Sequence, residues 1–122
     1  MIEINLDTNK FKLTVEGHAK PEETDRHAEI CAAVSAMAQG LAYSISRFEK
    51  DHNGINGIDY RSEPGDFLLQ IYQDDWVGSF VRKRMQAYGD GLEFMAACEP
   101  QSIHMIRDGE EIEAFKEGDF SE

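Results

Sequence analysis

The amino-acid sequence predicts an α+β fold, in which two helices pack on one face of a mostly antiparallel sheet within a single domain. Four short segments alternate apolar and polar residues, as strands with one buried face do. Two longer segments repeat their apolar residues at steps of three and four, as amphipathic helices do. The four alternating segments come in pairs joined by turn residues, which favours hairpins over βαβ crossovers and gives the order ββαββαβ.

The first strand pair and the first helix account for residues 2–48. Residues 2–6 and 11–15 alternate around the turn sequence "DTNK", which predicts a hairpin. A helix is expected over residues 25–48, because its apolar residues lie three or four positions apart along one stripe: Ile30, Val34, Met37, Leu41, Ile45 and Phe48. Alanines and Gly40 flank this stripe, so the helix can approach a neighbour closely.

The second half of the chain repeats this arrangement and adds a strand. The segment "DHNGINGID" (51–59) is expected to be a loop, and "IDYRS" and "DFLLQIYQ" are expected to be strands around the turn "EPGD". A second helix is predicted after Asp74 and Asp75, whose charges suit a helix N-terminus, with a possible kink at Gly89 and Gly91. The segment "PQSIHMIR" is expected to form a final short strand.

The domain is expected to span residues 1–106 and to be followed by an acidic C-terminal tail, residues 107–122. This last segment carries seven acidic and two basic residues, so a solvated and frayed segment is predicted rather than a site. The chain of 122 residues has no internal repeat or linker, and its length suits one hydrophobic core.

Composition and charge exclude several classes of function. The formal net charge is −12, which argues against direct binding to a nucleic-acid backbone and suits a basic protein partner. No stretch is long and apolar enough to predict a membrane span, and the N-terminus has no secretory signal. The two cysteines form no CxxC motif and no disulfide framework, so a cytoplasmic protein with free thiols is expected.

His18 and Cys31 are candidates for a reactive pair. Cys31 falls in the second turn of the predicted first helix, where the helix dipole gives some help to a thiolate. His18 lies at the end of a strand, after Gly17, where an imidazole could take the thiol proton. Nearby carboxylates, Glu22 and Glu23 among them, disfavour a thiolate but favour an imidazolium, so their net effect is open.

Three alternatives compete with this interpretation. Cys31 and His18 could be ordinary structural residues, since an isolated cysteine on a buried helix face is common. His27 and Cys31 share a helix face and could bind a metal with His18, although no established ligand motif supports this. Ser35 could simply bond the backbone carbonyl four residues earlier, or its hydroxyl could lie beside the thiol.

The motifs "GHA" (17–19) and "CAAVSA" (31–36), in this order and joined by a short loop, resemble the Prp family of ribosomal-processing cysteine proteases. The resemblance implies that His18 is the catalytic base, that Cys31 is the nucleophile and that Ser35 matches the family's serine. It also implies removal of a short N-terminal extension from a large-subunit ribosomal protein, or cleavage of a related phage structural protein. A homodimer is expected, with a His–Cys loop that is mobile until substrate arrives and with no metal or organic cofactor.

The loop between the two motifs, "KPEETDRHAEI", departs from the family pattern. It has no glycine and is one residue longer than is common, and Ala28 stands where the family has an Asp three residues before the cysteine. Asp25 could replace that acid. A catalytically inactive or retargeted homologue that acts as a dimeric binding module is therefore the main alternative, ahead of the metal-binding protein.

If the chain is a protease, standard acyl transfer applies. His18 would take the thiol proton, Cys31 would attack the scissile carbonyl, and His18 would protonate the leaving amine. Backbone N–H groups near the start of the first helix are expected to hold the oxyanion.

Overall fold

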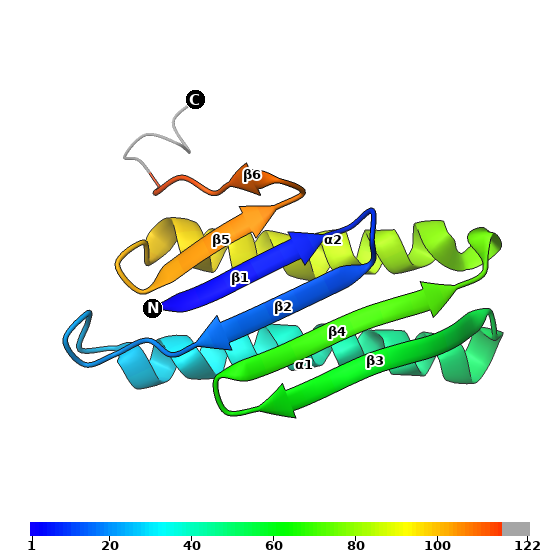
Figure 1. The fold of residues 1–122 in the computed structure, drawn as a ribbon, viewed down its shortest axis with the longest axis horizontal. Coiled ribbons are helices and arrows are strands. Elements are labelled where there is room, and N and C mark those ends of the chain that lie inside the picture. The colour runs from blue at the N-terminus through cyan, green and yellow to red at the C-terminus, as the bar shows by residue number, and fades with distance from the viewer. Residues whose placement is uncertain (116–122) are drawn as a thin grey trace.

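A six-stranded sheet covered on one face by two helices forms the protein, which we describe from a computed structural model over residues 1–115 (Figure 1). The sheet has the order β3-β4-β2-β1-β5-β6, and all neighbouring strands are antiparallel except β1 and β5, which are parallel. The elements are β1 (Ile2–Asp7), β2 (Lys12–Gly17), α1 (His27–His52), β3 (Ile55–Glu63), β4 (Asp66–Gln73), α2 (Asp75–Cys98), β5 (Ile103–Arg107) and β6 (Glu110–Glu111). The predicted α+β class and the two helices on one face are confirmed.

The core lies between the sheet and the helices, and its residues come from the alternating and helical patterns of the sequence. Alternate residues of β1, β2 and β4 point toward the helices and are almost fully buried, among them Leu6, Leu13 and Leu69. The buried stripe of α1 consists of Ile30, Val34, Ala38, Leu41, Ile45 and Phe48. Burial of these apolar surfaces is the main favourable term that holds α1, and with it Cys31, against the sheet.

The link between α1 and β3 is much shorter than the predicted loop over residues 51–59. Helix α1 continues to His52 and β3 begins at Ile55, so that prediction was wrong at both ends. Asn53 and Gly54 alone make the turn, with φ angles of 59° and 93°. These left-handed conformations, which Asn and Gly tolerate best, let the chain reverse in two residues.

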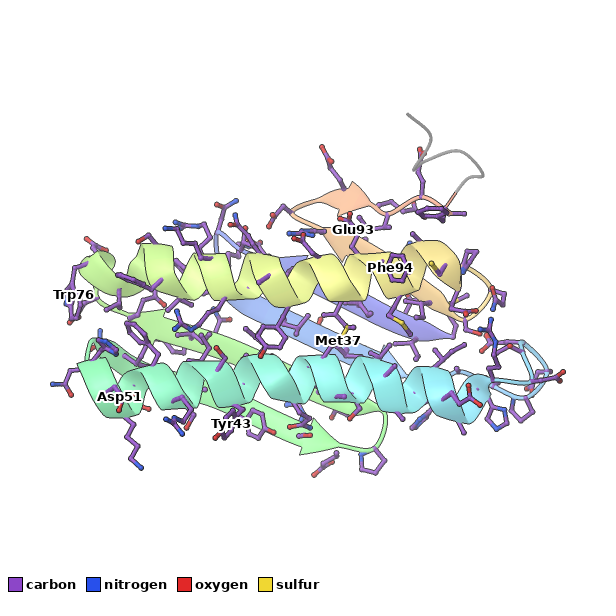
Figure 2. All side chains as sticks on the ribbon, turned by 180° about the vertical axis from the view of Figure 1, so that it is seen from behind. Met37, Tyr43, Asp51, Trp76, Glu93 and Phe94 are labelled. Atoms are coloured by element: carbon purple, nitrogen blue, oxygen red, sulfur yellow. The ribbon has the colours of Figure 1, made fainter. Side chains whose placement is uncertain are left out.

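Helix α2 remains helical through Gly89 and Gly91, where we expected a possible kink. Both glycines lie where another element comes close. A Cβ atom on Gly89 would lie 2.5 Å from Leu6 Cδ2, and one on Gly91 would lie 2.9 Å from Met37 Sδ. Figure 2 shows Met37 in the seam between α1 and α2, so these glycines allow α2 to pack against both the sheet and α1.

The sheet extends into the segment that was expected to be a tail. Arg107 is the last residue of β5, and Glu110–Glu111 forms β6 beside it. The Arg107 guanidinium pairs with Asp90 at 2.7 Å and with Glu93 at 3.3 Å, which ties β5 to α2. The rest of the predicted tail, residues 116–122, lies outside the described residues, and the limits of the domain stay a prediction.

Helix α1 is long and apolar enough to cross a membrane if only length and composition are counted. Six of its residues nevertheless belong to the buried face that packs on the sheet, as in the core helix of a globular domain. The expectation of no membrane span did not take the composition of this helix into account. The packing of α1 on the sheet explains why the helix is apolar.

Candidate active site

A pocket with a volume of about 430 Å³ opens at one end of α1, beside the end of β2 and the turn between β3 and β4. Both candidate reactive residues, His18 and Cys31, line it. Helix α1 also contributes Ser35, and the turn between β3 and β4 contributes Glu63 and Gly65. The structure therefore brings the two motifs that flank the loop of residues 20–30 to one cavity.

The end of β2 is fixed by Gly17, which has a φ of 88°. Its N–H donates to the Gly65 carbonyl at 2.9 Å, and a Cβ at this position would lie 2.4 Å from the Met1 carbonyl oxygen. A residue with a side chain would be strained here and would clash with the backbone at the start of β1. The glycine thus lets the chain turn out of the sheet and place His18 at the pocket.

The His18 side chain is exposed and lies against the turn between β3 and β4. A Cβ atom on Gly65 would lie only 2.4 Å from His18 Nε2, so the imidazole occupies the space that the glycine leaves open. Within residues 1–115, the imidazole of His18 makes no hydrogen bond. The ring therefore lines the same pocket as Cys31 without being held by another side chain.

Cys31 lies in the second turn of α1, as predicted, and is half-buried with a free thiol. The Ala19 N–H donates to its Sγ at 3.3 Å, and the thiol faces the Ala19 carbonyl at 3.9 Å. The residue after His18 is therefore bonded to the sulfur of Cys31. This contact couples the histidine end of the loop to the cysteine end.

Of the supporting residues predicted from sequence, the pocket contains Gly17 and Ser35 but not Asp25. Ser35 lies one turn after Cys31 on α1, and its hydroxyl makes no hydrogen bond to a backbone carbonyl in the described residues. Asp25 is exposed in the loop and does not line the pocket, so it does not replace the missing acid at this cavity.

Comparison with known protein families identifies the family of the chain. The profile of the family described as cysteine protease Prp matches residues 1–104. The chain belongs to the Prp cysteine protease family. No curated protein sequence matches it.

Among the solved structures that share the fold are two of the essential ribosomal processing protease Prp from S. aureus. The complex with a substrate peptide has a TM-score of 0.63 and 17% identity, and the match covers 87% of this chain and 96% of that one. The complex with a covalently linked product peptide has a TM-score of 0.58 and 16% identity, with coverages of 88% and 99%. These likenesses support the Prp fold of the whole domain.

The pocket of this Prp member has an acidic side that motif analysis missed. Glu63 and Asp66 line it at the turn between β3 and β4, where the sequence indicated only turn chemistry. Arg61 binds Asp66 through two hydrogen bonds of 2.8 Å and 3.1 Å. Glu63 is exposed and forms no salt bridge in residues 1–115, but it lies near enough to Arg61 to contribute to the raised pKa of that guanidinium, after the larger effect of Asp66.

Gln39 was also missed, and it separates the pocket from a second hollow. Its amide donates to Ser62 Oγ and accepts from the Tyr60 hydroxyl, so it joins α1 to the edge strand β3. The second hollow, of about 430 Å³, lies between the same elements and is lined by Gln39, Ala42, Tyr43, Ser46, Ile58, Tyr60 and Leu69. No sequence signal marks Gln39, because its role depends on side-chain contacts between α1 and β3, which are distant in the sequence.

The metal-binding alternative finds no ligand set in the described part of the chain. Among residues 1–115, no three His, Cys, Asp or Glu side chains lie close enough together to hold a metal ion. His27 is half-buried at the start of α1, and within residues 1–115 its Nδ1 has no hydrogen-bond partner. His18, His27 and Cys31 therefore do not form the three-ligand group that this alternative requires.

Proposed function

We propose that the chain is an endopeptidase that removes a short N-terminal extension from a large-subunit ribosomal protein, with Cys31 as nucleophile and His18 as general base. The observation that carries this proposal is that the two residues line one pocket, although a loop separates them in the sequence. Membership of the Prp cysteine protease family supplies the class of reaction.

The reaction follows acyl transfer by a thiolate. His18 takes the proton from the Cys31 thiol, and the sulfur attacks the carbonyl carbon of the scissile peptide bond to give a tetrahedral oxyanion. Collapse of this intermediate breaks the C–N bond, and His18 donates its proton to the departing amine. A water molecule, deprotonated by His18, then hydrolyses the thioester, which releases the extension and restores the thiol.

Two features of the free site suit this chemistry. The His18 imidazole is exposed and has no hydrogen bond in residues 1–115, so it can turn toward Cys31 when substrate binds, as catalytic contacts often tighten in the complex. The Ala19 N–H, 3.3 Å from the sulfur, is the donor best placed to hold the oxyanion. The lining of the pocket on α1 starts at Cys31, which disfavours the earlier N–H groups of the helix for that role.

A basic substrate is supported by charge. The net charge is −12, and Glu63 is exposed at the pocket and forms no salt bridge within residues 1–115, so a positively charged ribosomal precursor would be attracted to it. The similar solved structures are of a ribosomal processing protease bound to a substrate peptide or to a covalently linked product peptide, which agrees with this choice. We also propose a cytoplasmic homodimer, as the family resemblance implies.

Alkylation with iodoacetamide tests the reactive pair without any substrate. Cys31 is expected to react faster than Cys98, the exposed free thiol at the end of α2 and an internal control. Substitution His18→Ala is expected to slow labelling of Cys31 and to leave Cys98 unchanged, because only Cys31 shares its pocket with the imidazole. Equal rates at the two thiols, unaffected by the substitution, would contradict the pair.

Incubation with extended precursors of large-subunit ribosomal proteins tests the substrate. Mass spectrometry is expected to show one new N-terminus in one precursor, formed by the wild type and absent with Cys31→Ala. If Cys31 is reactive in the alkylation assay but no precursor is cut, the substrate assignment fails while the reactive pair stands. That outcome would favour the retargeted homologue.

A further inference from the structure

The backbone around His18 is held by three successive hydrogen bonds. The Gly17 N–H donates to the Gly65 carbonyl at 2.9 Å, and the Ala19 N–H donates to Cys31 Sγ at 3.3 Å. Between them, the His18 carbonyl accepts from the Met1 ammonium at 2.7 Å. The position of the imidazole therefore depends on the position of Met1.

Glu23 fixes Met1 in this place. Its carboxylate lies 2.9 Å and 3.1 Å from the Met1 ammonium nitrogen through its two oxygens. It also accepts from the Lys20 N–H at 2.8 Å, and the Lys20 carbonyl accepts from the Glu23 N–H at 2.9 Å. One side chain thus closes the turn after His18 and binds the cation that bonds the His18 carbonyl.

The charge of Glu23 is used differently from what the sequence suggested. As one of several carboxylates near the reactive pair, it could disfavour a thiolate or favour an imidazolium, and the sequence left the net effect open. The Met1 ammonium, by its hydrogen bond, lowers the pKa of the Glu23 carboxyl below its ordinary value of 4.5. Its negative charge is therefore paired with a cation, and only 19% of its side chain is exposed.

We propose that Glu23 is a positioning residue that holds the His18 backbone, through Met1 and Lys20, so that the imidazole stays at the Cys31 pocket. This inference rests on the His18–Cys31 pair proposed above. Glu23 touches neither the sulfur nor the pocket, so it acts only through the loop. Because the imidazole itself has no hydrogen bond in residues 1–115, its placement depends on the backbone that carries it and on the space above Gly65. The contacts of Glu23 hold that backbone.

Three variants separate this role from a general effect of charge or stability. Glu23→Ala removes every contact of the carboxylate, and Glu23→Gln keeps an amide oxygen that can still accept a hydrogen bond. Glu22→Ala is the matched control, because Glu22 is the neighbouring carboxylate of the same loop, is exposed and makes no hydrogen bond or ion pair in residues 1–115. The three variants are measured for the rate of Cys31 alkylation, for kcat and KM on the precursor, for amide exchange and for Tm.

Glu23→Ala is expected to lower kcat about tenfold with KM changed less than about twofold, since loss of orientation of a catalytic group acts on the chemical step. Glu23→Gln should fall in between, and Glu22→Ala should stay within about twofold of wild type. Amide exchange at Lys20 should speed up in Glu23→Ala and not in Glu22→Ala, while Tm stays close to wild type in both. A structural role alone would lower Tm and leave kcat unchanged at temperatures well below the transition.

The outcomes distinguish this inference from the proposed function. If His18→Ala slows alkylation of Cys31 but Glu23→Ala alters neither alkylation nor kcat, the positioning role is refuted and the reactive pair stands. Equal losses in Glu23→Ala and Glu22→Ala would also refute it, because they would reflect charge alone. If His18→Ala has no effect on Cys31, the pair itself fails, and Glu23 has no catalytic base to position.

Discussion

Substitution of Gly65 by alanine would displace the imidazole of His18, the proposed general base, although neither His18 nor Cys31 is itself changed. Gly65 lies in the turn between β3 and β4, and a Cβ atom there would come within 2.4 Å of His18 Nε2 and 3.0 Å of two other ring atoms. Contacts this short do not persist, so the imidazole must move. The ring is exposed and can swing away, which removes it from Cys31 at little cost in folding free energy.

The backbone conformation of Gly65 adds a second effect, a loss of stability, which a control variant can separate from the clash with the imidazole. Gly65 has a φ of 74°, and an alanine in this left-handed region costs about 1 kcal/mol of stability. Gly109 has a φ of 84° in the turn between β5 and β6, and a Cβ atom added there would have no neighbour within 4 Å among residues 1–115. Gly109→Ala therefore carries the same backbone strain with no clash against the imidazole.

Thermal unfolding and Cys31 alkylation measured together test this reasoning. Both variants should lose about 4 °C in Tm, which is what about 1 kcal/mol represents for a domain of this size. Only Gly65→Ala should slow Cys31 alkylation and precursor cleavage, to about the level of His18→Ala. If Gly65→Ala and Gly109→Ala retained the same activity, the imidazole would not depend on the space above Gly65, and the placement of His18 would be refuted.

Two further predictions concern stability. His104 forms hydrogen bonds with the carboxylates of Glu3 and Glu111, which raise the pKa of its imidazole above the ordinary 6.5. The stabilisation from these contacts is therefore fully present below pH 6.5 and is lost as the pH rises through the raised pKa. Denaturant unfolding of wild type and His104→Gln should differ at about pH 5.5 and converge at about pH 9; a constant difference would contradict this. Gly89→Ala should lower the free energy of unfolding by about 1–3 kcal/mol, because the added Cβ meets the buried Leu6. Gly91→Ala should be nearly neutral, because its Cβ meets only the flexible Met37. Equal losses in Tm for the two variants would contradict this packing.

The elements that were predicted well are those whose residues carry the pattern themselves. Alternation in residues 2–6 and 11–15, and the stripe from Ile30 to Phe48, follow from burial of one face, so sequence alone predicts most of them. Met37 is the exception in the stripe, where Ala38 is buried in its place, and β2 begins at Lys12 rather than at Phe11. The loop over residues 51–59 was wrong because the turn needs only Asn53 and Gly54. The residues on either side of this turn continue α1 and β3, because of contacts that no local sequence signal predicts.

The candidate site divides in the same way. His18, Cys31 and Ser35 could be found from their motifs, and the structure brings all three to one pocket. Asp25 was chosen by its place in the loop alone, and it lies outside. Gly65 could not be found, because its role arises from the pairing of β2 with β4, which brings the turn between β3 and β4 beside His18.

Glu23 illustrates the remaining limit of sequence reasoning. A carboxylate near a thiol is expected to oppose its ionisation, and the sign of the effect depends on what the carboxylate itself contacts. Its partner is the Met1 ammonium, which precedes β1, whereas Glu23 follows β2. Only the antiparallel pairing of Ile2 with Gly17 brings these groups together.

Detection of the acyl-enzyme tests the central claim most directly. The wild-type protein is mixed with an intact precursor that it is known to cleave. The reaction is quenched in acid within one turnover, and the protein is examined by intact mass spectrometry. The proposed mechanism predicts a thioester adduct on Cys31 with the mass of the released extension less one water, absent in Cys31→Ala and strongly reduced in His18→Ala. Cleavage that proceeds without this adduct and survives Cys31→Ala would contradict the assignment of Cys31 and His18 as the catalytic pair.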